Sequence, residues 1–385
     1  LCLNTPANRA NPTAMKTKAK QFIISALVAA AAMQTATAQT VWYDPMEGNE
    51  PNICNRAWNS EIGREYSRLP ERAKGKVSPN VYNLSKNSAG LHVRFVTKAP
   101  EITVEYDVAG GYDMNHMPAT GVSGLDLYAT DANGRELLIR GLYSFGKPIK
   151  YEYKALTYEN SGSDGYEYRL YLPLYNTVKN LKIGVDKQYP LRFTGPDRER
   201  QIVVYGTSIA QGGCASRPGM AWTNILQRKL RVPVVNLGFS GSAFLDAEVF
   251  KLMAETDARV FVIDCLPNMT TRERAAEIKQ KLAEGIKILR NKSKAPILVV
   301  EHDGYMGANS GVEQCSEKVV NKLQREAFDK LKKQYKGLYY LSYEELALSQ
   351  DSQVDGVHAS DLGMQQYADA YARKLKGILR RTSNK

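Results

Sequence analysis

Serine, aspartate and histidine occur in this sequence at positions that could cooperate in nucleophilic catalysis. Ser208 ends the triplet Gly206-Thr207-Ser208, just after a short apolar run, and His358 lies three residues after Asp355. A carboxylate one turn before a histidine can hold the ring Nδ1–H and leave Nε2 free to accept a proton. We therefore expect Ser208 to be a nucleophile, His358 its base and Asp355 the residue that orients the base. By itself, a glycine-rich segment such as the one around Ser208 is more often only a turn.

Two other turns carry groups that could stabilise an oxyanion. Gly241 lies in Ser240-Gly241-Ser242, and Asn268 follows Pro267. A glycine allows a backbone N–H to turn toward a ligand, and a side-chain amide after a rigid proline is a fixed donor. Taken singly, the first turn is better explained as a tight loop and the second as a helix N-cap.

The chain has four histidines. His92 lies in an alternating run and His116 in a loop rich in Met, Pro and Gly. His302 follows the apolar run 297–300 and is adjacent to Asp303 rather than one turn from a carboxylate. We expect His302 to contact the substrate or support the site, and His358 to be the base.

Residues 200–385 alternate continuous apolar runs with amphipathic segments. The expected strands are 202–205, 232–236, 260–264, 297–300 and 338–341, and the expected helices are 221–230, 247–255, 271–291, 316–336 and 361–379. This pattern is typical of a parallel sheet covered by helices on both faces. Such sheets bind ligands beyond the carboxyl ends of their strands, which is where Ser208, Gly241 and Asn268 are expected.

Residues 39–195 have a different periodicity. Apolar and polar residues alternate at 91–96, 102–108, 124–128, 137–139, 166–174 and 181–185, with turns rich in Gly and Asn between them. Period-2 runs with many tyrosines predict an antiparallel, jelly-roll-like β-sandwich. The sequence thus predicts an α/β domain at 200–385 preceded by a β-rich domain at 39–195.

The residues that follow the expected strands resemble the four ordered blocks of the SGNH, or GDSL, hydrolase family. Ser208 matches the nucleophile block, Gly241 and Asn268 match the oxyanion blocks, and Asp355 with His358 matches the Asp-x-x-His block. Thr207 and the pair Leu266-Pro267 depart from the family pattern but leave these side chains in place. In the first half, Gly124-Leu125-Asp126-Leu127-Tyr128 resembles the Gly-x-Asp-Leu-Tyr signature of a domain that precedes SGNH domains in exported bacterial esterases.

The resemblance implies a three-layer α/β/α catalytic domain and a serine esterase mechanism. His358 would deprotonate Ser208 as it attacks an ester carbonyl, and Asp355 would fix the tautomer of the ring. The N–H groups of Ser208 and Gly241 and the amide of Asn268 would bind the oxyanion. We expect no metal and no organic cofactor.

The N-terminal segment reads as a targeting signal. Residues 15–38 combine lysines after Met15, an apolar core at 22–33 and Ala36-Thr37-Ala38, which predicts a signal peptide cleaved after Ala38. Residues 1–14 read as an upstream leader or a mis-assigned start. We therefore expect an exported protein, periplasmic or secreted, without a membrane span.

The cysteines and the net charge place few limits on disulfide pairing and on the class of partner. Cys54, Cys214, Cys265 and Cys315 follow the predicted cleavage point, and four cysteines allow three disulfide pairings among which the spacing does not choose. No Cys-x-x-Cys and no Cys/His cluster occurs, so the sequence predicts no zinc site. The net charge of +12 is spread along the chain and mixed with acids, and we expect no nucleic-acid partner.

The expected substrate is a short acyl ester, most of all an O-acetyl group on a carbohydrate. Four polar residues near the expected oxyanion loops suit a hydroxyl-rich leaving group, although some could serve only as hydrogen-bonding groups within loops: Gln211, Arg217, Asn236 and Asp264. The alternatives are a lipase or thioesterase for longer chains and a non-catalytic glycan-binding protein. Phosphodiesterase chemistry usually needs metal ligands and is disfavoured.

Overall fold

The computed structural model describes residues 39–158, 161–305 and 314–383. The leader and signal peptide predicted at residues 1–38 lie outside the described residues. Among the helices of the described part, none is long and apolar enough to cross a membrane. Residues 41–385 belong to one compact unit, which holds both halves of the sequence.

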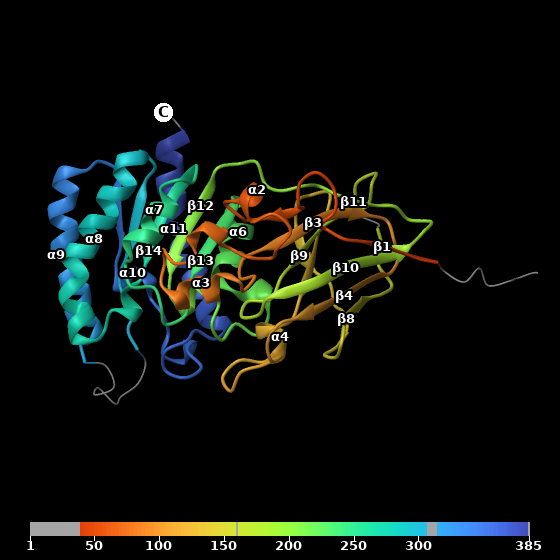
Figure 1. Ribbon diagram of the computed structural model, residues 1–385, viewed down its shortest axis with the longest axis horizontal. Helices are drawn as coiled ribbons and strands as arrows, with labels where there is room; N and C mark the ends of the chain where they lie inside the picture. Colours follow the sequence, from red (N-terminus) through yellow and green to blue (C-terminus); the bar gives the residue numbers. More distant parts are fainter. Residues whose placement is uncertain (1–38, 159–160, 306–313, 384–385) are drawn as a thin grey trace, which may run out of the picture. The chain divides into compact units, whose positions relative to one another are not determined.

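A five-stranded parallel sheet forms the centre of the second half (Figure 1), in the order β13-β12-β14-β15-β16. The strands are β12 (Gln201–Gly206), β13 (Val234–Gly238), β14 (Ala258–Asp264), β15 (Ile297–Val300) and β16 (Leu338–Leu341). Almost every residue in them is buried, because helices cover both faces of the sheet. The continuous apolar runs of the sequence predicted these strands to within two residues at either end.

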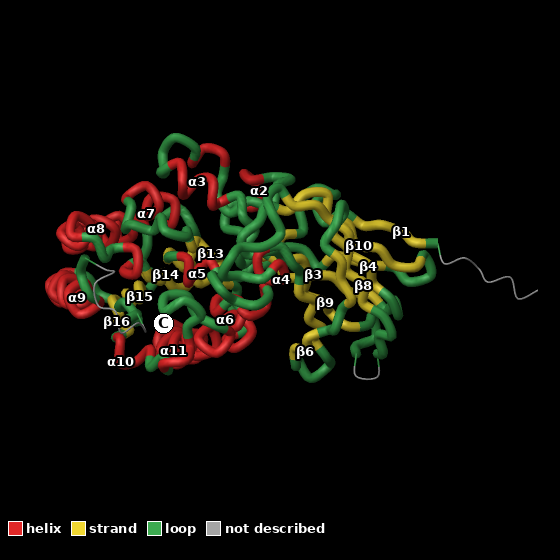
Figure 2. Tube along the Cα trace, turned by 90° about the horizontal axis from the view of Figure 1, so that it is seen from below, coloured by secondary structure: helices red, strands yellow, loops and turns green. Residues whose placement is uncertain are grey.

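Successive residues of each strand pack into different layers. Val203 and Tyr205 of β12 belong to the core under α7 (Ala247–Met253), α8 (Arg272–Lys292) and α9 (Glu317–Gln334). Ile202 and Val204 belong to the core under α6 (Trp222–Leu230) and α11 (Asp361–Ser383). Figure 2 shows these two groups of helices on opposite sides of the strands. The predicted three-layer α/β/α arrangement is confirmed.

The strand order reverses direction at the position where the functional residues were expected. The chain passes from β12 outward to β13 and then returns to the other side of β12 to form β14. In open α/β sheets, ligands bind at such a switch point, beyond the carboxyl ends of the strands. The short helix α5 (Ser208–Gln211) follows β12, and the 3-10 turn η3 (Leu266–Asn268) follows β14, so both lie at this switch point.

Two antiparallel sheets form the first half and enclose a core of their own. One has the order β1-β10-β4-β8-β7, with β1 (Thr40–Tyr43), β10 (Val178–Asp186), β4 (Ile102–Val108), β8 (Ile149–Tyr153) and β7 (Leu142–Ser144). The other has the order β11-β3-β9-β5-β6, with β11 (Leu191–Phe193), β3 (His92–Thr97), β9 (Tyr166–Tyr171), β5 (Asp126–Thr130) and β6 (Glu136–Leu138); β2 (Ile53–Cys54) pairs with β3. The predicted β-sandwich is confirmed.

The sequence missed five strands of the sandwich: β1, β2, β7, β8 and β11. Each has at most five residues and so offers little alternation to detect, although two strands as short as these, β5 and β6, were predicted. Short helices interrupt the sandwich, namely α2 (Asn59–Ile62), α3 (Pro79–Ser85) and α4 (Ala119–Val122), and α10 (Tyr343–Leu346) precedes α11 in the second half. α3 begins at Pro79, and the Ser78 side chain accepts a hydrogen bond from Val81 N, a regular N-cap.

Candidate active site

Ser208 is the first residue of α5, directly beyond the carboxyl end of β12. The Thr207 side chain caps this helical turn by accepting a hydrogen bond from Ile209 N, and Gly212 ends the turn with a φ of 108°. Three donors hold the carbonyl oxygen of Ser208: the backbone N–H groups of Gly212 and Gly213, at 3.0 and 2.8 Å, and the hydroxyl of Tyr175, at 3.1 Å. Ser208 is only 7% exposed, so most of this residue is buried in the turn that holds it.

His358 meets this hydroxyl although it lies 150 residues away in the sequence. Its Nε2 is 2.9 Å from Ser208 Oγ, and its Nδ1 is 2.7 Å from Asp355 Oδ2. The other carboxylate oxygen, Oδ1, accepts hydrogen bonds from the backbone N–H groups of Val357 and His358 at 3.0 and 2.7 Å. The structure therefore brings the predicted nucleophile, base and orienting carboxylate into one chain of hydrogen bonds.

These contacts also keep Asp355 ionised. Partial burial raises the pKa of this carboxyl, but hydrogen bonds from the backbone and ring of His358 and from the backbone of Val357 outweigh it, and the pKa lies below its usual value. A carboxylate that remains charged near neutral pH favours the tautomer of His358 with a proton on Nδ1. Nε2 is then the acceptor that faces the serine hydroxyl.

Asn268 and Gly241 lie in loops that touch each other. The amide of Asn268 fits its surroundings when its carbonyl oxygen accepts hydrogen bonds from the backbone N–H groups of Ser242 and Ala243, each at 3.0 Å. In this orientation its NH2 group is the part of the amide that remains to act as a donor. Gly241 has a φ of 62°, and its backbone conformation, rather than lack of space, calls for glycine, because an added Cβ would meet nothing within 4 Å.

The side chains of Gln211 and Asn236 form hydrogen bonds with the backbone of the loops around the site. Gln211 Oε1 accepts a hydrogen bond from Ser240 N at 3.0 Å, and Asn236 donates from Nδ2 to Ala210 O at 2.7 Å and accepts from Gly238 N. Both side chains are buried. Asp264 is buried as well and accepts a hydrogen bond from the Tyr371 hydroxyl at 2.7 Å. For these three residues the structure supports the alternative interpretation of the sequence, namely that they serve as hydrogen-bonding groups within the protein.

Arg217, the fourth of those polar residues, connects the site to the sandwich. It donates to Asp126 Oδ2 and to the Tyr128 hydroxyl, each at 2.8 Å, and Asp126 Oδ2 also accepts from Gly219 N at 2.6 Å. Asp126 and Tyr128 are the polar residues of the Gly-x-Asp-Leu-Tyr motif. The motif therefore holds the loop that follows Ser208, so the first half contributes directly to the position of the site.

His302 lies within the protein beside β15, with its ring fully buried. Its Nδ1 accepts a hydrogen bond from Gly304 N at 2.9 Å and lies 3.3 Å from Asp303 Oδ1. The structure thus gives His302 a local role in the loop after β15, and it places His358 rather than His302 against Ser208.

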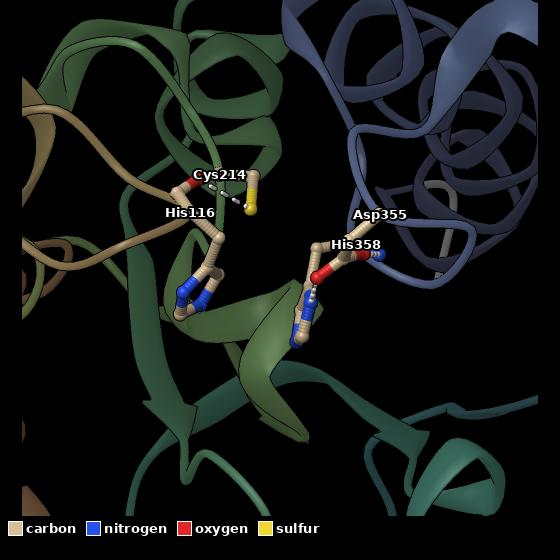
Figure 3. Close-up of side chains that lie close together, drawn as sticks. All are labelled: His116, Cys214, Asp355 and His358. Atoms are coloured by element: carbon tan, nitrogen blue, oxygen red, sulfur yellow. Dashed lines mark hydrogen bonds and ion pairs between the residues drawn. The ribbon is translucent and has the colours of Figure 1, made fainter.

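The structure also brings together residues that the sequence did not associate. All four cysteines after residue 38 are free thiols, so none of the three possible disulfide pairings is formed. Cys214 and His116, from different halves of the chain, lie beside Asp355 and His358 (Figure 3). The sequence contains no local Cys/His cluster, but the fold brings these four side chains together. The separation of 98 residues between His116 and Cys214 gave no signal in the sequence.

Both halves of the chain match known protein families. Residues 199–376 match the GDSL-like lipase/acylhydrolase family, and residues 40–191 match the family described as the N-terminus of SGNH-hydrolase-type esterases. No curated protein sequence matches the chain.

Solved structures also show similarity to this family and to its fold. A protein assigned as a GDSL-like lipase from Bacteroides ovatus is 30% identical, with a TM-score of 0.78 over 89% of this chain and 98% of that one. The salicylyl-acyltransferase SsfX3 of a tetracycline biosynthetic pathway is 15% identical, with a TM-score of 0.68 over 89% and 98% of the two chains. A family two carbohydrate esterase from Cellvibrio japonicus is 10% identical, with a TM-score of 0.51 over 89% and 98%. The last two show the fold alone, but the first, together with the two family matches, shows that this chain belongs to the SGNH/GDSL acylhydrolase family.

Proposed function

We propose that this acylhydrolase is a serine esterase that uses Ser208, His358 and Asp355 as its catalytic triad. The hydrogen bonds of 2.9 Å from the Ser208 hydroxyl to His358 Nε2 and of 2.7 Å from His358 Nδ1 to Asp355 Oδ2 carry the proposal. Ser208 Oγ attacks the ester carbonyl while its proton passes to His358 Nε2. The proton then goes to the leaving alcohol as the acyl-enzyme forms, and water releases the acid by the same route.

The oxyanion that forms at the carbonyl needs donors in place before the reaction begins. We propose the backbone N–H groups of Ser208 and Gly241 and the NH2 group of Asn268 for this role. The two backbone donors that hold the Asn268 carbonyl oxygen support it, because they fix the direction of the amide. A preorganised donor of this kind contributes about 2.7–4 kcal/mol in the transition state.

The proposed substrate is a short acyl ester, most of all an acetyl group on a carbohydrate. The base and its carboxylate are partly open to solvent: the side chains of His358 and Asp355 are 20% and 35% exposed. An open site suits an acyl group carried on a large polar molecule, whereas a long acyl chain needs a covered apolar surface. A carbohydrate esterase among the proteins of the same fold and the predicted export of this chain are consistent with this substrate.

Hydrolysis of p-nitrophenyl esters from acetate to palmitate tests both parts of the proposal. We expect the highest kcat/KM at acetate or butyrate and acetate release from acetylated glycans. Ser208→Ala should lower kcat by about 10⁶ and leave the melting temperature unchanged, because within the described part of the chain the Ser208 hydroxyl is hydrogen-bonded only to the catalytic base. A serine-reactive phosphonate should label Ser208 alone.

The other outcomes have distinct meanings. A maximum at octanoate or longer would replace the acetylesterase with a lipase. Ser208→Ala with more than a few per cent of wild-type kcat would exclude Ser208 as the nucleophile. A wild-type protein that hydrolyses no ester and leaves Ser208 unlabelled would instead be a glycan-binding protein.

A further inference from the structure

Four potential metal ligands converge at the edge of the candidate triad (Figure 3). They are His116, in the turn before α4 of the sandwich, Cys214, in the loop after α5, and Asp355 with His358. One ligand atom of each lies within 4.8 Å of the ligand atoms of the other three. The rings of His116 and His358 lie 5.5 Å apart between centroids, and the Cys214 thiol lies between their two segments in Figure 3.

The types of these ligands select a particular class of cation. Two imidazoles, a thiolate and a carboxylate are the donors that Zn²⁺ takes in tetrahedral sites, at about 2.0–2.3 Å. A tetrahedron of that size places its ligand atoms roughly 3.3–3.8 Å apart. The four ligand atoms already lie within 4.8 Å of one another. The separation of any pair therefore exceeds the edge of that tetrahedron by at most about 1–1.5 Å, and small side-chain rotations would close the site.

The surroundings of Cys214 hold its sulfur in this position. The thiol donates to His116 O at 3.2 Å, which ties the sandwich turn to the loop after α5. The sulfur carries a proton in the metal-free protein, because it is the donor of this hydrogen bond. When a cation binds, the S–H bond breaks, the proton goes to solvent and a sulfur–metal bond forms.

This cluster differs in the charge of its surroundings from a second group of three potential metal ligands, which lies in the sandwich. The ligand atoms of this second group, Cys54, His92 and Asp197, also lie within 4.8 Å of one another. However, the guanidinium of Arg94 lies 2.7 Å from the Asp197 carboxylate. Burial and then the positive charges of Arg169 and Arg94 lower the pKa of His92. Two positive charges repel a cation. At Cys214 the neighbouring charge is the carboxylate of Asp355, which attracts one.

We propose that His116, Cys214, Asp355 and His358 form a binding site for a thiophilic divalent cation, with Zn²⁺ as the best fit, and that the bound cation switches the esterase off. If the metal takes Nε2 of His358, the lone pair that accepts the serine proton is lost. If it takes Nδ1, the remaining ring proton lies on Nε2 and faces Ser208, so the base is lost again. The binding follows from the ligand geometry, whereas the inhibition rests on the proposed function.

Cobalt absorption tests the binding without any reference to catalysis. The metal-free protein is titrated with Co²⁺, and thiolate-to-cobalt charge transfer is recorded before and after addition of Zn²⁺. We expect one Co²⁺ per chain with a thiolate band that Zn²⁺ abolishes. Cys214→Ser should lose the band, and His116→Ala should weaken Zn²⁺ binding by about tenfold or more. Cys315→Ser, which removes a partly exposed thiol outside the cluster, should behave as wild type.

Inhibition is measured on the same proteins with p-nitrophenyl acetate. Zn²⁺ should inhibit the wild-type protein and the Cys315→Ser control reversibly, and a chelator should restore the rate. Cys214→Ser should hydrolyse the ester at the wild-type rate without zinc and need about tenfold more Zn²⁺ for inhibition. A Co²⁺ complex without a thiolate band, or equal Zn²⁺ affinity in Cys214→Ser and wild type, would overturn the site. If the protein proves to have no esterase activity, the cobalt titration still decides whether the site exists.

Discussion

Replacing Asp355 by asparagine tests whether the carboxylate sets the tautomer of His358 or only its position. Asparagine has nearly the same shape, and its carbonyl oxygen can still accept the hydrogen bonds from Val357 N and His358 N, now 3.0 and 2.7 Å long. The NH2 group would then face His358 Nδ1, where Asp355 Oδ2 lies at 2.7 Å. Because an NH2 group only donates, Nδ1 must become the acceptor and the ring proton moves to Nε2.

The expected magnitude follows from this change of tautomer. With a proton on Nε2, the ring donates to Ser208 and can no longer accept its proton, so the base is lost although its position is kept. We expect kcat to fall by about 10⁴, or roughly 5.4 kcal/mol. The loss is smaller than the roughly 10⁶ expected for Ser208→Ala or His358→Ala, because another tautomer remains accessible at a cost.

The assay compares kcat on p-nitrophenyl acetate for wild type, Asp355→Asn, Asp355→Ala and Asp351→Asn. Asp351 is an exposed aspartate of the same segment and serves as the matched control, with activity close to wild type. Alanine leaves the ring free to choose its tautomer, so Asp355→Ala should be at least as active as Asp355→Asn. An asparagine variant that retains more than a tenth of wild-type kcat, or clearly exceeds the alanine variant, would refute the tautomer argument and leave Asp355 a positioning role.

Three further predictions concern the groups around the triad. Asn268→Ala should lower kcat by about 10²–10³ with little change in KM, because its donor acts mainly in the transition state; a pure KM effect would make Asn268 a substrate-binding residue. Gly241→Ala should lower the free energy of unfolding by roughly 1–2 kcal/mol in urea titrations, because φ is 62° there, and an unchanged stability would contradict that backbone conformation. Burial raises the pKa of Asp264 from 3.8 to about 7, so between these values the folded state holds a proton that the unfolded state has released, and stability falls as pH rises. The free energy of unfolding of Asp264→Asn relative to wild type should therefore increase from pH 5 to pH 8, and a constant difference would contradict the raised pKa.

The fold could be predicted from the sequence because the patterns that indicate its strands and helices lie within short segments. Apolar runs such as 260–264 and 297–300 identify buried parallel strands, and α8 and α9 follow from their amphipathic spacing. In the sandwich, alternation over six or seven residues identified β4 and β9, whereas β2 and β7, with two and three residues, gave no usable period.

The candidate triad was accessible for a related reason. Asp355 and His358 are three residues apart, so the bond between them depends on one local turn. Ser208 lies at the end of a strand, and a parallel sheet brings its carboxyl ends to one edge whatever the distance along the chain. Residue types and strand ends together were therefore sufficient to nominate the residues that lie 2.9 and 2.7 Å apart in the structure.

The surroundings of that triad were decided only by the tertiary structure. Gln211, Asn236 and Asp264 looked available to a substrate in the sequence, but burial uses their polar atoms for internal hydrogen bonds. His116 and Cys214 had no common signal, yet the packing of the sandwich against the α/β half brings them to His358. Sequence periodicity fixes which face of an element is buried. Which side chain of one domain meets which loop of another depends on long-range packing, and no local pattern encodes it.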